Sequence, residues 1–414
     1  MSFKRVPLGE LLDGKGYIRG PFGSALKRAD MHESGIPVYE QQHAIYGHRD
    51  FRYFIQDDKF QKLNRFQVQS NDLIISCSGT VGRISIIKES DPQGIISQAL
   101  LILRVDSQKL LPDFLYYFLT SPVGKRELLN ASQGAVQQNI APRAVVEKIE
   151  VPLPDMSIQK LIVNQLKNLD KKVWVNTTIN ETLEEMAQAI FKSWFVDFDP
   201  VKTKMNGEQP EGMDAATASL FPEKLVESEL GLIPEGWEAK QLKDILELAY
   251  GKALKKIDRV EGDVPVYGSG GLTGYHNQSL VEGPGIIVGR KGTVGSVYWE
   301  PKAFYPIDTV FYVKPKAGYS LNYCYLILQN LGLKNMNTDA AVPGLNRNNA
   351  YRLEVVTPSQ GVLNKFESLM SAFQSKIDGN NAENSSLETL RDTLLPKLLS
   401  GEIELDVERV NAND

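Results

Sequence analysis

Cysteine is nearly absent from this chain. Only Cys77 and Cys324 occur among 414 residues, which excludes a disulfide framework and a zinc site built from several cysteines. The sequence also lacks any run of about 18 apolar residues, so no membrane-spanning helix is expected. Its first residues, MSFKRVPLGELL, have no apolar segment of the kind found in secretory signals. We therefore expect a protein of the cytoplasm.

Histidine is scarce too, and no catalytic or metal-binding motif is evident. The four histidines show neither i, i+4 spacing with glutamate nor zinc-finger spacing, and no G-x-S-x-G motif occurs. The glycines of GPGIIVGRKGT (283–293) do not form a phosphate loop, because Gly289 is followed by arginine and no helix is expected after them. The acidic DFDP (197–200) is more simply a solvated helix end than a metal site. We predict no metal, no cofactor and no catalysis in this chain.

Basic and acidic residues are unevenly distributed along the chain, whose net charge is −5. Residues 1–150 and 239–358 carry net charges of +3 and +4, whereas residues 151–238 and 359–414 carry −7 and −5. Nucleic acid responds to local charge rather than to the total. Two basic blocks would suit such a partner, although chance also produces values this small.

Two long stretches, residues 155–200 and 359–404, have the spacing of amphipathic helices. Apolar residues recur at steps of three and four, which places them on one face, together with the polar Gln165 and Asn176. About 36 residues at about 1.5 Å each make a rod of about 54 Å. Such a stripe requires a partner helix, so the two stretches are predicted to pair in an antiparallel manner. The apolar positions are Ile158, Ile162, Leu169, Val173, Ile179, Leu183, Met186 and Ile190 in the first and Leu363, Phe366, Met370, Phe373, Ile377, Leu387, Leu390, Leu394 and Leu398 in the second.

The two halves of the chain resemble each other at a period of roughly 205 to 235 residues. Each half reads mostly as strand, with a GTVG hairpin and one short helix, and is followed by its long helix. This predicts an α+β fold of two pseudo-repeated αβ domains, 1–154 and 237–358, joined by the helices, with a linker of little core at 201–236 and a tail at 405–414. The matching segments are GIPVYEQQ and DVPVYGSG, DLIISCSGTVGRISII and GIIVGRKGTVGSVYW, GIISQALLILRV and AFYPIDTVFYVK, LPDFLYYFL and LNYCYLIL, and GAVQQNIAPRAVVEKIEVPLP and AAVPGLNRNNAYRLEVVTPS.

Glycine-rich loops of both halves combine Arg or Lys with Gln, Asn, Ser, Thr or His. Such side chains suit base edges and phosphates of DNA, although glycine, asparagine and serine are also ordinary turn residues. Taken as a set on two equivalent basic domains, the loops favour DNA recognition. The candidate DNA-binding residues are Ser24, Lys27, Arg28, Gln41, Gln42, His43, Arg49, Thr80, Arg83, Gln137 and Gln138 in the first domain and Lys255, Lys256, Tyr275, His276, Arg290, Lys291, Thr293, Asn346 and Arg347 in the second.

The chain resembles the specificity subunit of type I restriction-modification systems. The resemblance rests on FKSWFVDFDP followed by GLIPEGWE between the halves, LLPKLLSGEIEL at the end, PFGS near the start, the two GTVG hairpins and the repeat itself. It implies that each αβ unit is a target-recognition domain and that the helices are the antiparallel spacer. It also implies a split, asymmetric DNA site, two docked adenine methyltransferase subunits that use S-adenosylmethionine, and an endonuclease/translocase subunit that uses ATP and Mg.

Three other interpretations remain open from the sequence. The subunit could serve a system in which methylation and cleavage are fused in one partner. The chain could instead be a coiled-coil scaffold with two protein-binding domains and no DNA, which DNA affinity and its salt dependence would test. An unrecognised nuclease or transferase would require activity of the purified chain without a partner.

Overall fold

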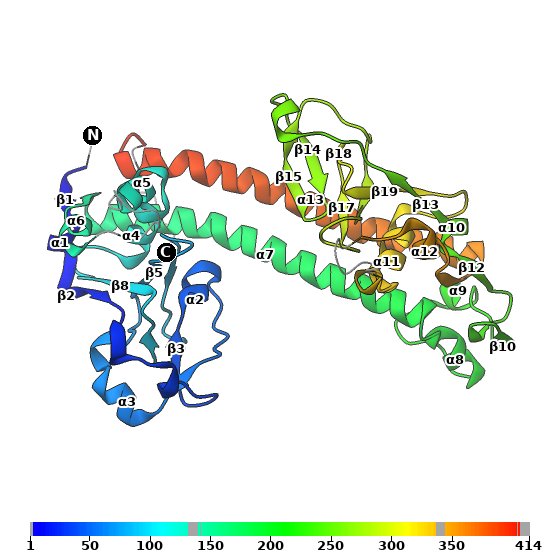
Figure 1. Cartoon of the computed structure of the whole chain (residues 1–414), viewed down its shortest axis with the longest axis horizontal. Helices are drawn as coiled ribbons and strands as arrows, with labels where there is room; N and C mark the ends of the chain where they lie inside the picture. Colours follow the sequence, from blue (N-terminus) through cyan, green and yellow to red (C-terminus); the bar gives the residue numbers. More distant parts are fainter. Residues whose placement is uncertain (1–2, 131–139, 141, 337–343, 404, 406–414) are drawn as a thin grey trace. The chain divides into compact units, whose positions relative to one another are not determined.

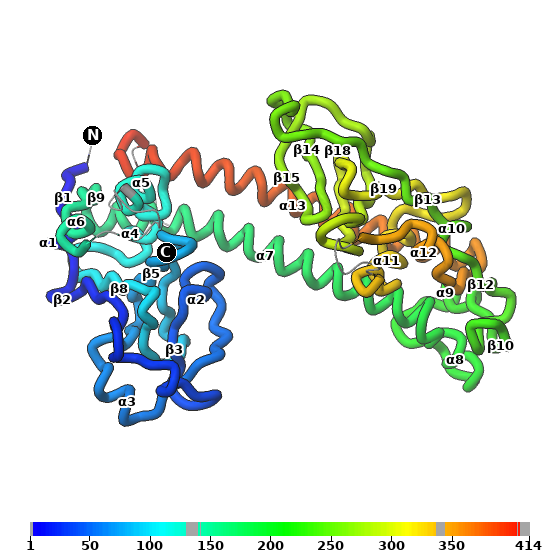
Figure 2. Tube along the Cα trace, viewed as in Figure 1, coloured from blue at the N-terminus to red at the C-terminus, as the bar shows by residue number. Residues whose placement is uncertain are grey.

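The computed structural model describes residues 3–130, 140, 142–336, 344–403 and 405 (Figure 1). Its internal contacts divide the chain into two compact units. Unit 1 consists of Met1–Trp174 and Asn384–Asp414, and unit 2 is the intervening Val175–Glu383. Figure 2 shows the trace of the chain, coloured from the N-terminus to the C-terminus.

The described residues of unit 1 form three small sheets. The largest has the strand order β2-β8-β5-β6, a second has β4-β3-β7 with β3 and β7 parallel, and β1 pairs with β9. Its strands are β1 (Arg5–Pro7), β2 (Leu12–Arg19), β3 (Ile36–Tyr39), β4 (Phe54–Ile55), β5 (Leu73–Ser76), β6 (Ile84–Ile86), β7 (Ile95–Ile96), β8 (Leu100–Val105) and β9 (Glu150–Pro152). Its short helices are α1 (Leu8–Leu11), α2 (Gln41–Tyr46), α3 (Asp57–Lys62), α4 (Pro112–Thr120), α5 (Pro122–Asn130) and α6 (Arg143–Val146).

Unit 2 repeats this arrangement. Its sheets have the orders β13-β19-β16-β17 and β15-β14-β18, with β14 and β18 parallel, and β12 pairs with β20. Its strands are β10 (Leu225–Ser228), β11 (Gly231–Pro234), β12 (Glu238–Gln241), β13 (Leu246–Tyr250), β14 (Val264–Gly268), β15 (Gly271–His276), β16 (Gly285–Gly289), β17 (Val297–Glu300), β18 (Tyr305–Pro306), β19 (Val310–Pro315) and β20 (Glu354–Thr357). Its short helices are α8 (Asp199–Met205), α9 (Ala215–Ala218), α10 (Leu242–Ile245), α11 (Leu321–Asn330) and α12 (Arg347–Tyr351).

The matching sheet orders confirm the internal repeat. Each four-stranded sheet joins equivalent strands, and each three-stranded sheet contains the same parallel pair. The units differ after the first strand of the smaller sheet. Unit 1 inserts α2 there, whereas unit 2 turns directly into the β14–β15 hairpin.

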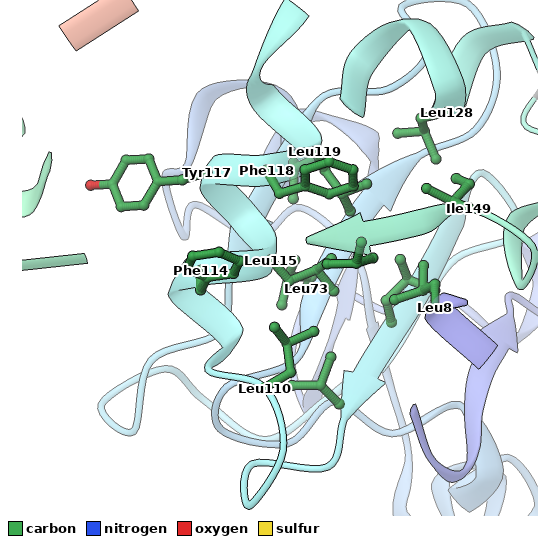
Figure 3. Packing of buried hydrophobic residues seen from close by; sticks show 14 of the residues in the cluster. Leu8, Leu73, Leu110, Phe114, Leu115, Tyr117, Phe118, Leu119, Leu128 and Ile149 are labelled. Atoms are coloured by element: carbon green, nitrogen blue, oxygen red, sulfur yellow. The ribbon is translucent and has the colours of Figure 1, made fainter. Parts of the chain in front are cut away.

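Alternation along the central strands explains why the larger sheet of unit 1 is buried on both faces. On β5, Leu73 and Ile75 point into one core cluster and Ile74 into the other, as expected for a period of two residues. Phe114 and Leu115 of α4 cover the first cluster (Figure 3). Burial of each such side chain contributes about 1.5–3 kcal/mol, so the sheet and α4 form one stable body.

The two predicted long helices are α7 (Met156–Phe195) and α13 (Gln360–Ser400). In unit 1 the Asp170 carboxylate of α7 meets Arg391 of α13, and in unit 2 the rings of Phe195 and Phe366 are 4.8 Å apart. Within unit 2, Asn176 of α7 donates to Glu383 of α13, whereas Phe195 meets Phe366. Residue numbers therefore rise in α7 as they fall in α13, and the pairing within unit 2 is antiparallel. Together with the repeated sheets, this confirms the predicted α+β fold class.

Residues 204 positions apart are equivalent in the two long helices. Ile162 and Phe366 are both fully buried, and so are Asn176 and Asn380. The repeat therefore extends through the helices without insertions, unlike the loops of the domains.

The expected linker at residues 201–236 has more core than the sequence indicated. Val201 and Phe221 are buried, and Phe221 packs edge-on against Trp194 of α7 at 5.0 Å. Proline and glycine do interrupt this segment, but its apolar residues find a surface on the helix end. The prediction of little core here was wrong, because the apolar residues of this segment are buried against the end of α7 and not against neighbours in sequence.

Helix α7 ends at Phe195. Phe198 takes a left-handed conformation (φ 57°), and Asp199–Pro200 open α8 instead of continuing α7. None of the helices in the described ranges is long and apolar enough to cross a membrane.

Candidate nucleic-acid interface

An equivalent loop connects the hairpin strands of the larger sheet in each unit: residues 77–83 in unit 1 and 290–296 in unit 2. In unit 1 the N–H of Gly82 donates to the carbonyl of Ser76 at 2.9 Å, and in unit 2 the N–H of Gly295 donates to Gly289 at 2.9 Å. Gly82 and Gly295 have positive φ angles of 78° and 68°, where a Cβ would be strained. The two GTVG segments therefore share one backbone conformation and hold Thr80 and Thr293 exposed at the tip.

Different serines brace the two loops. In unit 1 the hydroxyl of Ser76 donates to the carbonyl of Thr80 at 2.6 Å. In unit 2 the hydroxyl of Ser296 lies 3.1 Å from the corresponding carbonyl of Thr293 and shares its one hydrogen between that carbonyl and the carbonyl of Ser269. The supporting serine of unit 1, Ser76, ends the first strand of the hairpin, whereas that of unit 2, Ser296, precedes the second strand. The position of Ser296 is therefore taken in unit 1 by Arg83, which is exposed.

Helix α2 lies against the unit 1 loop. The side-chain amide of Gln41 donates to the carbonyl of Ser78, and the hydroxyl of Ser85 donates to the carbonyl of His43 at 2.9 Å. Gln42 follows Gln41 on the helix and is half-buried. The sequence singled out the segment with Gln41 and Gln42 and the GTVG segment of unit 1. The structure places these two segments side by side.

His43 is a buried support of this region. Its Nδ1 accepts the N–H of Glu40 at 2.7 Å, so its Nε2 carries the proton and donates to the carbonyl of Asp50 at 3.0 Å. Burial lowers the pKa of His43, which keeps the ring neutral. Both ring nitrogens are used within the fold.

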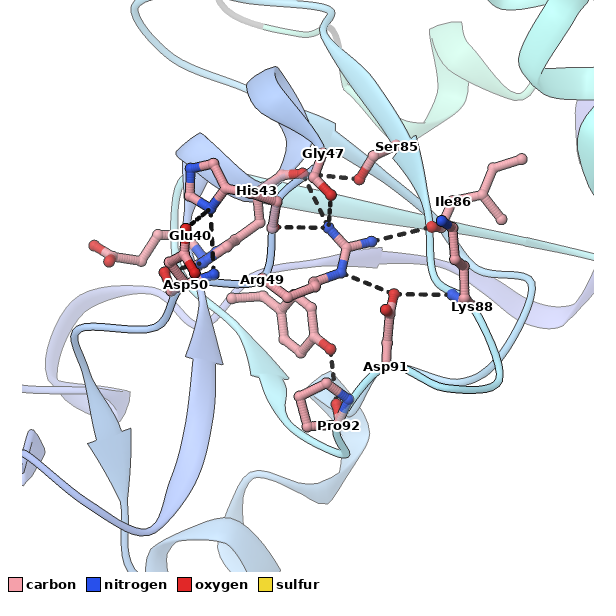
Figure 4. Close-up of polar contacts among 12 residues, drawn as sticks. Glu40, His43, Gly47, Arg49, Asp50, Ser85, Ile86, Lys88, Asp91 and Pro92 are labelled. Carbon is pink, nitrogen blue, oxygen red and sulfur yellow. Dashed lines mark hydrogen bonds and ion pairs between the residues drawn. The ribbon is translucent and has the colours of Figure 1, made fainter. Parts of the chain in front are cut away.

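Arg49 is held by the same network (Figure 4). Its Nε donates to the carboxylate of Asp91 at 2.8 Å, and Nη2 donates to the carbonyl of Ile86 at 3.1 Å. Nη1 donates to the carbonyls of His43, Gly47 and His48. A guanidinium used in this way positions the loop and is not presented to a ligand.

In unit 2 the ring of Tyr250 contacts two arginines that are distant in sequence. The guanidinium carbons of Arg290 and Arg347 lie 4.9 and 4.7 Å from the ring centroid of Tyr250. Nη1 of Arg290 donates to the carbonyl of Asp308, and within the described ranges neither arginine has a carboxylate partner. The Nε of Arg347 is buried and has no hydrogen-bond acceptor among the residues that the structure describes.

Backbone contacts bring the GLNRNN segment to the same place. The N–H of Leu345 donates to the carbonyl of Arg290 at 2.8 Å, and Lys291 forms a β-bridge with Gly344. The Asn346 side chain caps α12 by accepting two backbone N–H groups. Lys291 and Asn346 remain exposed.

The β14–β15 hairpin completes the cluster in unit 2. The hydroxyl of Ser296 donates to the carbonyl of Ser269 at 2.8 Å, which places the hairpin turn beside the GTVG loop. His276 is buried and its Nδ1 accepts the N–H of Val260 at 3.0 Å. Tyr275 is 54% exposed on the same strand.

The candidate residues divide by exposure. Those exposed are Ser24, Lys27, Arg28, Thr80, Arg83, Lys255, Lys256, Tyr275, Lys291, Thr293 and Asn346. Those half-buried are Gln41, Gln42, Arg49, Arg290 and Arg347, and those buried are His43 and His276. Gln137 and Gln138 lie outside the described residues. The sequence pattern singled out the segment YGKALKK and its lysines but not Tyr250, whose role depends on two arginines that are distant in sequence.

Groups of three or more His, Cys, Asp or Glu side chains suited to a metal ion do not occur among the residues that the structure describes.

This chain is similar to known type I restriction enzyme specificity subunits. The family model of the type I restriction modification DNA specificity domain matches residues 23–185 and 234–388. The type I restriction enzyme HindI specificity subunit of Haemophilus influenzae is 27% identical, over 78% of this chain and 84% of that protein. The MjaIX specificity subunit of Methanocaldococcus jannaschii is 23% identical, over 72% of this chain and 70% of that protein.

A solved structure agrees at the level of the fold. The crystal structure of the type I restriction-modification S subunit from M. genitalium has a TM-score of 0.58 and 19% sequence identity, and the match covers 98% of this chain and 97% of that one.

The two family matches fall on the two repeated units and together cover most of the chain, which confirms the resemblance noted in the sequence. Specificity subunits are the non-catalytic DNA-recognition subunits of their systems, in line with the prediction that this chain is not an enzyme. The chain belongs to the type I restriction-modification specificity family and is a specificity subunit with two target-recognition domains.

Proposed function

We propose that this subunit reads a bipartite, asymmetric site on double-stranded DNA, one half-site with each unit. The convergence of Tyr250, Arg290, Lys291 and Arg347 around one GTVG loop is the observation that carries this proposal. Unit 1 has the same loop backbone but presents Arg83 instead. One scaffold with two sets of side chains supports two different half-sites.

Roles within each unit follow from exposure and chemistry. Exposed lysines and arginines outside the loop, namely Lys27, Arg28, Lys255 and Lys256, suit phosphates, which position the protein without reading sequence. Arg83, Lys291 and Gln42 suit base edges, whereas the Asn346 oxygen is used to cap α12, which leaves its exposed amide N–H groups as donors. In the proposal, His43, Arg49 and His276 act by holding the loops in place.

The long helices are proposed to dock two adenine methyltransferase subunits and to recruit an endonuclease/translocase. The exact period of 204 residues in α7 and α13 supports two docking surfaces of similar design. S-adenosylmethionine, ATP and Mg would be bound by those partners, and fusion of methylation and cleavage in one partner would use the same surfaces.

A scaffold that binds only proteins is the alternative, and DNA affinity separates the two. A DNA-reading subunit should bind its site with an affinity that falls steeply as salt rises, because phosphate contacts release counterions. Affinity that is absent, or insensitive to salt, would favour the scaffold.

Methylated adenines should be mapped in the native genome with this gene intact and deleted. A split, asymmetric motif that disappears on deletion would support the proposal and give both half-sites and their spacing. A map that does not change in a strain with an active system would contradict it.

A further inference from the structure

The two units treat one equivalent position of the helix pair differently. In unit 1 the Asp170 carboxylate accepts the hydroxyl of Tyr117 at 2.6 Å and Nη1 of Arg391 at 3.0 Å. Asp170 lies on α7, Arg391 on α13 and Tyr117 on α4, so one charged network joins three helices. Figure 3 shows the Tyr117 hydroxyl pointing away from the apolar cluster that holds Phe114, Leu115 and Phe118 of α4.

In unit 2 the repeat places smaller or uncharged residues at these positions. The period of 204 residues matches Arg391 with Ala187 and Asp170 with Gln374. On α11, Leu326 takes the place that Tyr117 has on α4, counted from the N-caps Ser320 and Leu111. The described part of unit 2 therefore has no equivalent of the Asp170–Arg391–Tyr117 network, and no guanidinium lies between its helices at this position.

A groove of about 460 Å³ lies where the network would be. Ala187, Gln374 and Leu326 all line it, and its floor is apolar, with Met370 and Phe373. Ala187, at the position equivalent to Arg391, leaves part of this space open.

The rim of the groove is acidic. Glu181, Glu184 and Glu185 line it, and the described residues include no ion pair to any of the three. Partial burial raises the pKa of Glu184, and the nearby charge of Glu181 raises it further. An apolar floor under unpaired carboxylates suits an arginine, whose methylene stem packs on apolar surface while its guanidinium meets carboxylates.

We propose that this groove of unit 2 receives an arginine side chain of the methyltransferase subunit, which takes the place that Arg391 fills within unit 1. The identity of the partner rests on the proposed function. The groove makes the two docking surfaces unequal. On unit 2 the guanidinium comes from the partner, whereas on unit 1 it is that of Arg391 in this chain.

The test measures binding of the purified methyltransferase subunit to the full-length chain by calorimetry. The first variant is the double substitution Glu181→Gln/Glu184→Gln, which removes two negative charges and keeps the size of both side chains. The second is Ala187→Arg, which places a guanidinium of this chain itself in the groove. Glu388→Gln is the matched control, because Glu388 is exposed and lies 204 residues from Glu184 on the surface of unit 1.

Both groove variants should weaken one of the two binding steps by about tenfold or more, since a desolvated charge pair is lost or blocked, and should leave the other step unchanged. Glu388→Gln should bind as the wild type. Equal binding by all variants would overturn the inference, and so would a structure of the complex in which no cationic side chain of the partner reaches Glu184. DNA affinity of the isolated variants should match the wild type, which shows that they are folded. A chain that fails to bind DNA would instead count against the proposed function.

Discussion

At the residue scale, cations in one loop region have opposite roles. Arg49 donates to one carboxylate and four carbonyl groups inside the fold, whereas Arg83 is exposed on the GTVG loop. Sequence patterns predicted that these loops carry cations, but they could not distinguish the two arginines. Whether a loop side chain turns inward depends on carbonyls and carboxylates such as Asp91, which distant segments bring.

Replacement of the two arginines should therefore separate binding from stability. We expect Arg83→Ala to alter recognition of one half-site and to change the free energy of unfolding by less than about 0.5 kcal/mol. Arg49→Met should destabilise unit 1 by about 3–5 kcal/mol, because the largely buried Asp91 carboxylate loses its ion pair and keeps only the N–H of Lys88. Urea unfolding and DNA affinity on both half-sites check this, and a loss of stability in Arg83→Ala would assign it a structural role instead.

The two cysteines should make stability depend on alkaline pH. Burial raises the pKa of Cys77 and of Cys324 to about 12, so the folded state keeps both thiols protonated. Unfolded thiols ionise at about pH 8.5, and the stability contributed by the protonated form is therefore present below that pH and lost above it. Each thiol should lower the free energy of unfolding by up to about 1.4 kcal/mol per pH unit above about pH 9. Cys77→Val should reduce this slope, and an unchanged slope in urea titrations would rule out the thiol as its source.

At the scale of elements, buried asparagines interrupt the apolar seam of the long helices. Asn180 donates to Asn381 and accepts from Asn380, both at 2.8 Å, and Asn176 donates to Glu383 at 2.8 Å. The sequence showed Asn176 on the stripe, and its spacing predicted helices that pair. It could not show which asparagines meet, because their register depends on packing along the whole pair.

A double-mutant cycle should measure this polar layer. Asn180→Leu alone should cost about 1–3 kcal/mol, because it leaves the buried amide of Asn380 without a partner. Adding Asn380→Leu should recover most of that loss, since an apolar pair fills the seam. The double variant should, however, pair its helices less specifically, and analytical ultracentrifugation should then detect self-association of the protein. Additive losses in the two single variants would mean that the asparagines do not act together.

At the scale of the whole molecule, the repeat was the most reliable prediction from sequence. Strand pairs, the GTVG loops and both long helices followed from periodicity and turn residues. The departures from the repeat were harder to foresee, as Ala187 at the position equivalent to Arg391 illustrates, because a single small residue matters only when its neighbours in space are known.

The helices should set the spacing of the DNA site if the proposed function is correct. Insertion of seven residues after Asn176 in α7 and seven after Asn380 in α13 preserves the apolar stripe and adds about 10 Å to each helix. The tolerated gap between half-sites should grow by about three base pairs, at about 3.4 Å each. A methylation map of a strain with the double insertion checks this, with insertion in α7 alone as the control for disrupted pairing. An unchanged gap would show that the helices do not measure it.

The division of the chain has a consequence for its synthesis on the ribosome. Unit 2 is one continuous segment, but the core of unit 1 includes Leu395, Leu398 and Leu399 from the far end of the sequence. Unit 1 is translated first and yet must wait for unit 2, with the apolar face around Ile162 and Leu166 uncovered. At about 5–20 residues per second, more than 200 residues separate that face from its partner, a delay of roughly 10 to 40 seconds. The second unit should therefore finish folding before the first, and the nascent chain should need protection by chaperones during that interval.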